Sequence, residues 1–181
     1  NISCPNVESE FGQPFACSTH DAEKATKIVK KKCKNIPLSV KLSPNVVNIS
    51  EIAKAVENAG ADAITAINTV GPGMVIDIET AQPILANKVG GLSGPAIKAI
   101  AVKAVWDIYK SVKIPIIGTG GISTGRDAIE IIQAGATLVG VGSAVIEGSD
   151  VFVKIAEEMQ IWCEKHEVKN ISELVGMTHE G

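Results

Sequence analysis

Short apolar runs and amphipathic segments alternate along most of the chain. The apolar runs have the length of buried strands and lie at residues 36–42 and 61–68 and at the starts of 114–123 and 137–144. The amphipathic segments space their apolar residues as helices with one buried face do, at residues 21–33, 49–58, 95–111, 125–135 and 150–166. In the first of these helices the expected buried stripe is Ala22, Ala25, Ile28 and Val29. The alternation predicts βα units on a parallel sheet, an α/β fold.

Five strand ends follow from this pattern, at residues 1–5, Lys41, Asn68, Gly118 and Gly142. A complete (β/α)8 TIM barrel needs about 250 residues, so a barrel would be represented here by its last five βα units. The whole of residues 1–181 would then be the C-terminal part of one domain. An open five-stranded sheet is the alternative. We expect residues 69–93 to run over the mouth of the barrel and residues 169–181 to be ordered only locally.

Glycines gather at the ends of the last two strands. Gly118, Gly120 and Gly121 follow one strand, and Gly142 and Ser143 follow the next. Glycine loops are often simple turns, but two of them one βα unit apart expose backbone N–H groups at neighbouring strand ends. The loops after strands seven and eight of (β/α)8 barrels commonly bind phosphate. We therefore predict a phosphate-binding cradle, strengthened by the helix N-termini that follow.

Composition narrows the function classes. The chain is 45% hydrophobic and only 3% aromatic, which is typical of parallel sheets buried on both faces. Its 17 Lys and Arg residues against 20 Asp and Glu residues give no electrostatic case for nucleic-acid binding. No apolar run reaches the roughly 18 residues of a membrane span. The four cysteines show no metal-ligand spacing, so we expect no metal site and a cytoplasmic protein.

The polar residues at the strand ends are the candidates for chemistry. Cys4 lies in a polar loop just past a strand, where a thiol can serve as a general base, although most cysteines are inert packing. Lys41 ends a buried strand and either reaches solvent or meets a ligand's negative charge. Asn68 and Thr69 provide an amide and a hydroxyl, or simply turn the chain. We assign Cys33 and Cys163 to packing. The set suits redox catalysis on a bound cofactor.

Six motifs, taken in order, resemble those of one family. NISCPN, VKLSPN, AINT, GGLSGPAIK, PIIGTGGI and VGVGSA together are similar to the catalytic subunit of class 1 dihydroorotate dehydrogenases, over nearly the whole chain. The form GGLSGPAI resembles class 1B, which passes electrons to NAD⁺ through a second subunit. The family has proline where this chain has Ala99, a departure that we expect to leave the site intact. Since the chain opens inside a motif at Asn1, we expect further residues to precede it in the parent protein.

The resemblance implies an FMN enzyme that oxidises dihydroorotate to orotate in pyrimidine synthesis. Cys4 corresponds to the base that removes the C5 proton while FMN accepts hydride from C6. The positions that match substrate-binding residues are Asn1, Asn68 and Thr69. The positions that match FMN contacts are Asn1, Lys41, Ile67, Gly94, Gly120, Gly121, Gly142 and Ser143.

The resemblance also implies binding partners, and three other functions remain as alternatives. The resemblance implies a homo- or hetero-oligomer, with FAD and a [2Fe-2S] cluster on an electron-transfer partner subunit, and no contact with nucleic acid or membrane. A tRNA-dihydrouridine synthase would use the same cofactor but calls for a basic surface. A non-redox phosphate-binding barrel, such as an isomerase or aldolase, would leave Cys4 without a role. A barrel fragment that only assembles with another chain is the non-enzymatic alternative.

Overall fold

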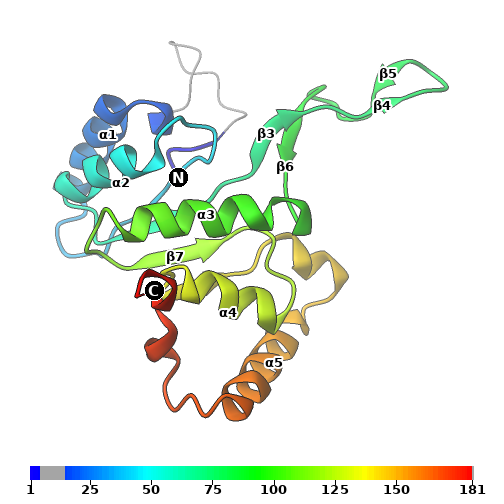
Figure 1. Cartoon of the computed structure of the whole chain (residues 1–181). Helices are drawn as coiled ribbons and strands as arrows, with labels where there is room; N and C mark the ends of the chain where they lie inside the picture. The colour runs from blue at the N-terminus through cyan, green and yellow to red at the C-terminus, as the bar shows by residue number, and fades with distance from the viewer. Residues whose placement is uncertain (5–14, 181) are drawn as a thin grey trace.

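A computed structural model describes residues 1–4 and 15–180 of the chain. Its centre is a parallel sheet with the strand order β1-β2-β7-β8, and β7 of this sheet lies between α3 and α4 in Figure 1. The strands are β1 (Ser39–Lys41), β2 (Ala63–Ala66), β7 (Ile116–Thr119) and β8 (Leu138–Gly140). The helices are α1 (Thr19–Lys32), α2 (Ile49–Asn58), α3 (Lys98–Tyr109), α4 (Gly125–Gln133) and α5 (Val151–Lys165). Helices α2, α3 and α4 each connect one strand to its parallel neighbour, so the predicted βα alternation is confirmed.

The sheet has four strands rather than the five predicted. Residues 1–4 form no strand, and Pro5, the end of the predicted first strand, lies outside the described residues. Within the described part of the chain β1 and β8 are the two edges of the sheet. The four strands run in the same direction, so their carboxyl ends lie at one edge of the layer.

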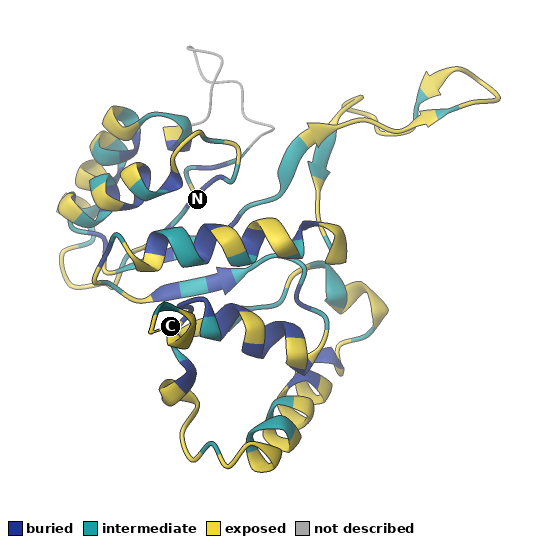
Figure 2. Ribbon diagram, in the orientation of Figure 1, coloured by how far each residue is buried: buried dark blue, intermediate teal, exposed yellow. Residues whose placement is uncertain are grey.

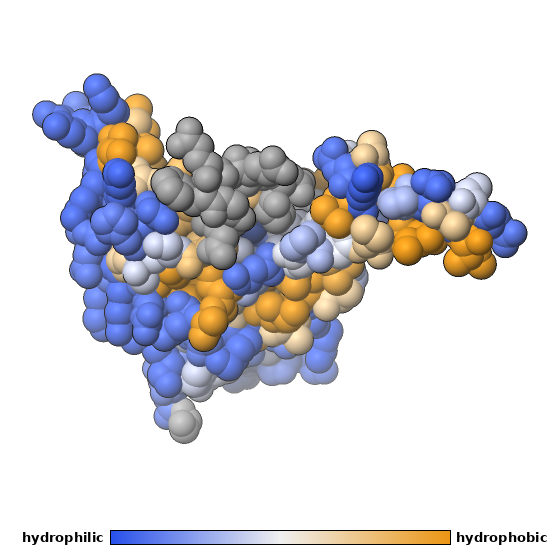
Figure 3. Space-filling view, turned by 90° about the horizontal axis from the view of Figure 1, so that it is seen from above, coloured by the Kyte–Doolittle hydropathy of each residue, from blue (hydrophilic) through white to orange (hydrophobic). Residues whose placement is uncertain are grey.

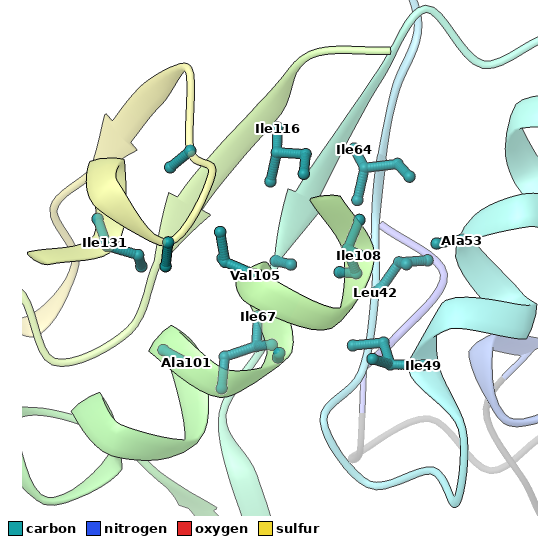
Figure 4. Close-up of a cluster of buried hydrophobic side chains, with 14 of the residues drawn as sticks. Leu42, Ile49, Ala53, Ile64, Ile67, Ala101, Val105, Ile108, Ile116 and Ile131 are labelled. Atoms are coloured by element: carbon teal, nitrogen blue, oxygen red, sulfur yellow. The ribbon is translucent and has the colours of Figure 1, made fainter. Parts of the chain in front are cut away.

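The core fixes β2 and β7 against α3. Ile64 and Ile116 are register partners on these two strands and are 0% and 1% exposed. They pack in the same cluster as Val105 and Ile108 of α3 (Figure 4). Fully burying each such side chain contributes about 1.5–3 kcal/mol. This packing holds the ends of the two central strands in place, next to each other.

Helix α1 does not bury the stripe predicted from its sequence. Ala22 and Thr26 are its buried residues, four positions apart on one face. Ile28 and Val29 are 57% and 41% exposed, so the predicted stripe is wrong at these two positions, while Ala25 is half-buried. The small side chains of Ala22 and Thr26 allow a close approach to α2, and they therefore decide which face turns inward.

The last residues are more ordered than predicted. They form two short 3-10 helices, η4 (Ile171–Leu174) and η5 (Met177–His179). Leu174 is 1% exposed and packs with Ile129 and Ile132 of α4. The N–H of Gly176 donates to the carbonyl of Ile132 (3.1 Å) and the hydroxyl of Thr178 donates to that of Gln133 (2.9 Å). The tail therefore satisfies the carbonyl of Gln133, which the end of α4 leaves free, and adds a further bond to that of Ile132.

Residues 70–92 form a projecting arm of paired strands. β3 (Val70–Gly73) pairs antiparallel with β6 (Gly90–Leu92), and β4 (Ile76–Asp77) pairs with β5 (Gln82–Pro83). The arm extends away from the sheet and is largely exposed (Figures 1 and 2). Apolar side chains cover much of its surface in the view from above (Figure 3). The sequence predicted an excursion here but not these strand pairs. No helix in residues 1–4 and 15–180 is long and apolar enough to cross a membrane.

Candidate active site

A pocket of about 270 Å³ lies at the carboxyl ends of β1, β2 and β7 and at the loop after β8. Parallel α/β folds place ligands at this edge of the sheet. The pocket brings together nine of the residues predicted for the site: Lys41, Ile67, Asn68, Thr69, Gly94, Gly120, Gly121, Gly142 and Ser143. Their convergence follows from the topology, because each residue ends or follows a strand, or precedes the helix that leads to one.

Four lining residues were not predicted from the sequence, namely Ser93, Ile97, Thr119 and Ile122. Thr119 could have been predicted from the sequence, because it is the last residue of β7 and directly precedes the glycines. Two predicted residues, Asn1 and Cys4, are not among the residues that line the pocket. Ala99 faces a separate groove of about 480 Å³ between the β1–α2 loop and α3. Its position agrees with the expectation that this departure from the family pattern leaves the site intact.

The loop after β7 owes its glycines to packing and backbone conformation. Gly120 and Gly121 have φ angles of +131° and +74°, which L-residues with side chains rarely adopt. A Cβ on Gly120 would lie 2.7 Å from the Cβ of Ala101, and one on Gly121 would lie 2.8 Å from the backbone nitrogen of Lys98. Both glycines therefore let the loop pack closely against the start of α3.

The predicted contribution of the α4 N-terminus to anion binding is wrong in part, because protein groups already occupy its donors. The N–H groups of Ser123 and Thr124 donate to Asp127 Oδ2 at 3.1 and 2.9 Å. The N–H of Gly125 donates to Glu158 Oε2 (2.5 Å), and that of Asp127 donates to Thr124 Oγ1 (3.2 Å) in a capping box. The helix end is thus already capped by carboxylates and a hydroxyl.

Free donors lie instead on the glycines. In the described part of the chain the backbone N–H groups of Gly120, Gly121 and Gly142 donate to no other residue. A Cβ on Gly142 would meet nothing within 4 Å, so this residue borders open space. Unpaired N–H groups beside an open space are suited to an anion such as phosphate. The N–H groups available for the predicted cradle are therefore those of the glycines and not those of α4.

A partly buried ion pair holds the loop after β7 in place. Lys98 Nζ lies 2.8 Å from Asp127 Oδ1 and 3.0 Å from Glu130 Oε2, which links the start of α3 to the first turns of α4. Burial raises the pKa of Asp127, but hydrogen bonds from Lys98, Ser123 and Thr124 lower that pKa more, to about 2. Hydrogen bonds to Asp127 and Glu130 raise the pKa of Lys98. The ammonium of Lys98 is therefore already paired with two carboxylates of the protein.

Lys41 differs from Lys98 in this respect. It is the one charged residue among those lining the pocket, and it is half-buried at the end of β1. Its ammonium makes no ion pair with any residue in ranges 1–4 and 15–180. A half-buried cation without a protein partner favours a ligand that carries negative charge.

The N-terminal residues are tied to the pocket through Asn68. Asn68 Nδ2 donates to the carbonyl oxygen and to the hydroxyl of Ser3, at 2.9 and 3.0 Å. Cys4 directly follows Ser3 and is half-buried. Cys17 lies in the short 3-10 helix η1 (Phe15–Cys17), where burial raises the pKa of its thiol. A raised pKa disfavours the reactive thiolate of Cys17.

In residues 1–4 and 15–180 no three His, Cys, Asp or Glu residues group as a metal site.

Comparison with known proteins identifies the family. A family model described as dihydroorotate dehydrogenase matches residues 1–162. The chain belongs to the dihydroorotate dehydrogenase family. The sequence is 45% identical to the protein named dihydroorotate dehydrogenase B (NAD(+)), catalytic subunit, of Methanothermobacter thermautotrophicus, over 99% of this chain and 59% of that protein. The proteins of the same name from Desulforamulus reducens and Methanocaldococcus jannaschii are 48% and 50% identical, each over 99% of this chain and 58% of the relative.

Membership of the dihydroorotate dehydrogenase family confirms the resemblance predicted from the six motifs. The chain spans somewhat less than three-fifths of the length of these curated relatives. These matches do not favour the two alternative enzyme classes, tRNA-dihydrouridine synthases and non-redox phosphate-binding barrels.

Proposed function

We propose that this chain is the C-terminal part of the FMN-dependent catalytic subunit of a dihydroorotate dehydrogenase, folded as the last βα units of a single (β/α)8 barrel domain. One observation carries the proposal: a single pocket collects nine residues that the family resemblance assigned to flavin or substrate. The two exposed sheet edges, β1 and β8, are the places where the remaining strands of a barrel would pair.

The residues present fit FMN. Free N–H groups of Gly120, Gly121 and Gly142 would hold its phosphate, and Lys41 would face the negative charge that develops on its ring. When bound, FMN supplies the acceptor for the hydride. Asn1, Asn68 and Thr69 would hold dihydroorotate, and the thiolate of Cys4 would take the proton from C5. Loss of that proton and of a hydride from C6 leaves the double bond of orotate, so the reaction balances.

Replacing Cys4 tests the proton transfer. In the FMN-loaded full-length subunit, Cys4→Ala should retain flavin but slow its reduction by dihydroorotate about 100- to 10,000-fold, the usual contribution of a general base. Cys4→Ser should act only weakly. Cys17→Ala is the matched control and should reduce flavin at the wild-type rate. Flavin reduction by Cys4→Ala at that rate would assign the proton transfer to another residue.

The electron acceptor calls for a separate proposal. The chain carries no GxGxxG motif after a strand and no cysteine set with the spacing of an iron–sulfur site, whereas the relatives are named NAD(+)-linked catalytic subunits. We propose that a partner subunit with FAD and a [2Fe-2S] cluster passes the electrons to NAD⁺. Dihydroorotate should then reduce the FMN of the isolated subunit, and NAD⁺ should reoxidise it only after the partner is added. Rapid turnover with fumarate alone would indicate class 1A instead.

A further inference from the structure

Ser3 lies between the two asparagines that the proposed function assigns to the substrate, and neither the sequence motifs nor the pocket lining single it out. The residue is 1% exposed, and its hydroxyl is one of few buried side-chain polar groups in the described residues. Ser3 N and Ser3 Oγ both donate to Asn1 Oδ1, at 3.1 and 2.8 Å. Ser3 O and Ser3 Oγ both accept from Asn68 Nδ2, at 2.9 and 3.0 Å.

These bonds fix the orientation of both amides, because some of the partners have only one possible role. A backbone N–H can only donate, so the Asn1 atom that faces Ser3 N is the carbonyl oxygen. A backbone carbonyl can only accept, so the Asn68 atom that faces Ser3 O is the amide nitrogen. The N–H of Thr69 donates to Asn68 Oδ1 (2.8 Å), which independently requires the same orientation. The Ser3 hydroxyl completes the network by accepting from one amide and donating to the other.

The network leaves each asparagine with a single kind of free hydrogen-bonding group. Both hydrogens of Asn68 Nδ2 are used by Ser3, so toward a ligand Asn68 can only accept, through the remaining lone pair of Oδ1. Asn1 Oδ1 already accepts two bonds, whereas its Nδ2 donates to no residue in ranges 1–4 and 15–180, so Asn1 is left as a donor.

We propose that Ser3 is a positioning residue of the substrate site, which sets Asn1 as a hydrogen-bond donor and Asn68 as an acceptor toward the substrate. This inference rests on the proposed function. An acceptor beside a donor matches the N–H and C=O groups that alternate around a cyclic amide such as dihydroorotate. Without the Ser3 hydroxyl, each amide loses one hydrogen bond and keeps only its bonds to backbone groups, so it is held less firmly in the orientation that the substrate requires.

The test compares variants of the FMN-loaded full-length subunit, titrated with orotate and followed by calorimetry. Ser3→Ala should weaken orotate binding about tenfold, the effect of roughly one lost hydrogen bond, and raise KM for dihydroorotate by a similar factor with a smaller change in kcat. Ser3→Thr retains the hydroxyl and should stay within about threefold of wild type. Thr26→Val removes a buried hydroxyl that bonds to Ala22 O (2.7 Å) in α1, and serves as the control, with unchanged orotate affinity.

Three outcomes would overturn the proposal. Wild-type orotate affinity in Ser3→Ala would show that the hydroxyl does not position the amides. Equal losses in Ser3→Ala and Ser3→Thr, with parallel falls in melting temperature, would show that the site depends on packing volume instead. A wild-type subunit that binds flavin but no orotate would overturn the proposed function itself, which the first two outcomes leave standing.

Discussion

The loop after β7 is held by protein contacts on several sides, whereas the loop after β8 borders open space. Gly120 and Gly121 pack against Ala101 and Lys98, and Asp127 binds the backbone just beyond them. Gly142 has no neighbour within 4 Å of the position a Cβ would take, and the 3-10 helix that follows, η3 (Ser143–Glu147), buries none of its residues. Glycine thus serves two purposes at neighbouring strand ends. In the first loop it allows close packing against α3, and in the second it borders open space, where we propose that phosphate binds.

Gly121→Val should have the largest effect on stability. A β-branched residue at a φ of +74° is strained, and its Cβ would lie 2.8–2.9 Å from the backbone of Lys98. We expect a loss of about 4 kcal/mol in the free energy of unfolding, the sum of backbone strain and overpacking. Urea denaturation of the full-length subunit measures this loss. A variant of wild-type stability would show that α3 and the loop can move apart freely.

Asp127→Asn should have the second-largest effect on the free energy of unfolding. An amide keeps one oxygen for the N–H groups of Ser123 and Thr124 but removes the charge that holds Lys98. Lys98 is partly exposed and keeps its bond to Glu130, so losing this charge should cost about 2–3 kcal/mol, the contribution of a hydrogen bond to a charged group. Asp107→Asn is the matched control, because Asp107 pairs with Lys103 on the exposed side of α3 and should contribute less than about 1 kcal/mol. Equal losses in the two variants would mean that the pair between Lys98 and Asp127 contributes no more than a surface pair.

Acid should reproduce part of that loss. The pKa of Asp127 is about 2 in the folded protein and about 3.9 in an unfolded chain, so its stabilising contribution is complete above about pH 4. It is lost as the pH falls toward 2, and it amounts to about 2 kcal/mol. Comparing urea midpoints at pH 5 and pH 2.5 in the wild type and in Asp127→Asn isolates this part. The variant should lose less stability than the wild type, and parallel losses would contradict the assignment.

The sequence predicted those features that depend on local periodicity and on strand direction. The apolar residues of α4, such as Ile129 and Ile131, are buried as expected, because one helical period decides which face turns inward. Lys41, Asn68 and Gly142 converge as expected, because the carboxyl ends of parallel neighbours share an edge.

The features that the sequence missed depend on contacts between distant segments. Ser3 bonds to Asn68, 65 positions away, and no local pattern in the sequence marks that pairing. The docked tail depends on a carbonyl group that α4 leaves free, which only the folded helix presents. The capping of α4 by Glu158 likewise requires α5 to lie beside it. In the case of α1, two small residues outweighed the larger Ile28 and Val29 in deciding the buried face.

Gly142→Val should have the smallest effect on stability and the most selective effect on binding. Its Cβ would enter open space, so the free energy of unfolding should change by less than about 1 kcal/mol. The same side chain would occupy the place beside the free N–H of Gly142, where the proposed cradle receives phosphate. FMN binding to the full-length subunit should therefore weaken about 30-fold, the loss expected for one or two hydrogen bonds to a charged group. Riboflavin has the same ring without the phosphate, and its weaker affinity should change little. Equal losses for FMN and riboflavin would place the ring rather than the phosphate against Gly142. Unchanged FMN affinity would remove the loop after β8 from the cradle.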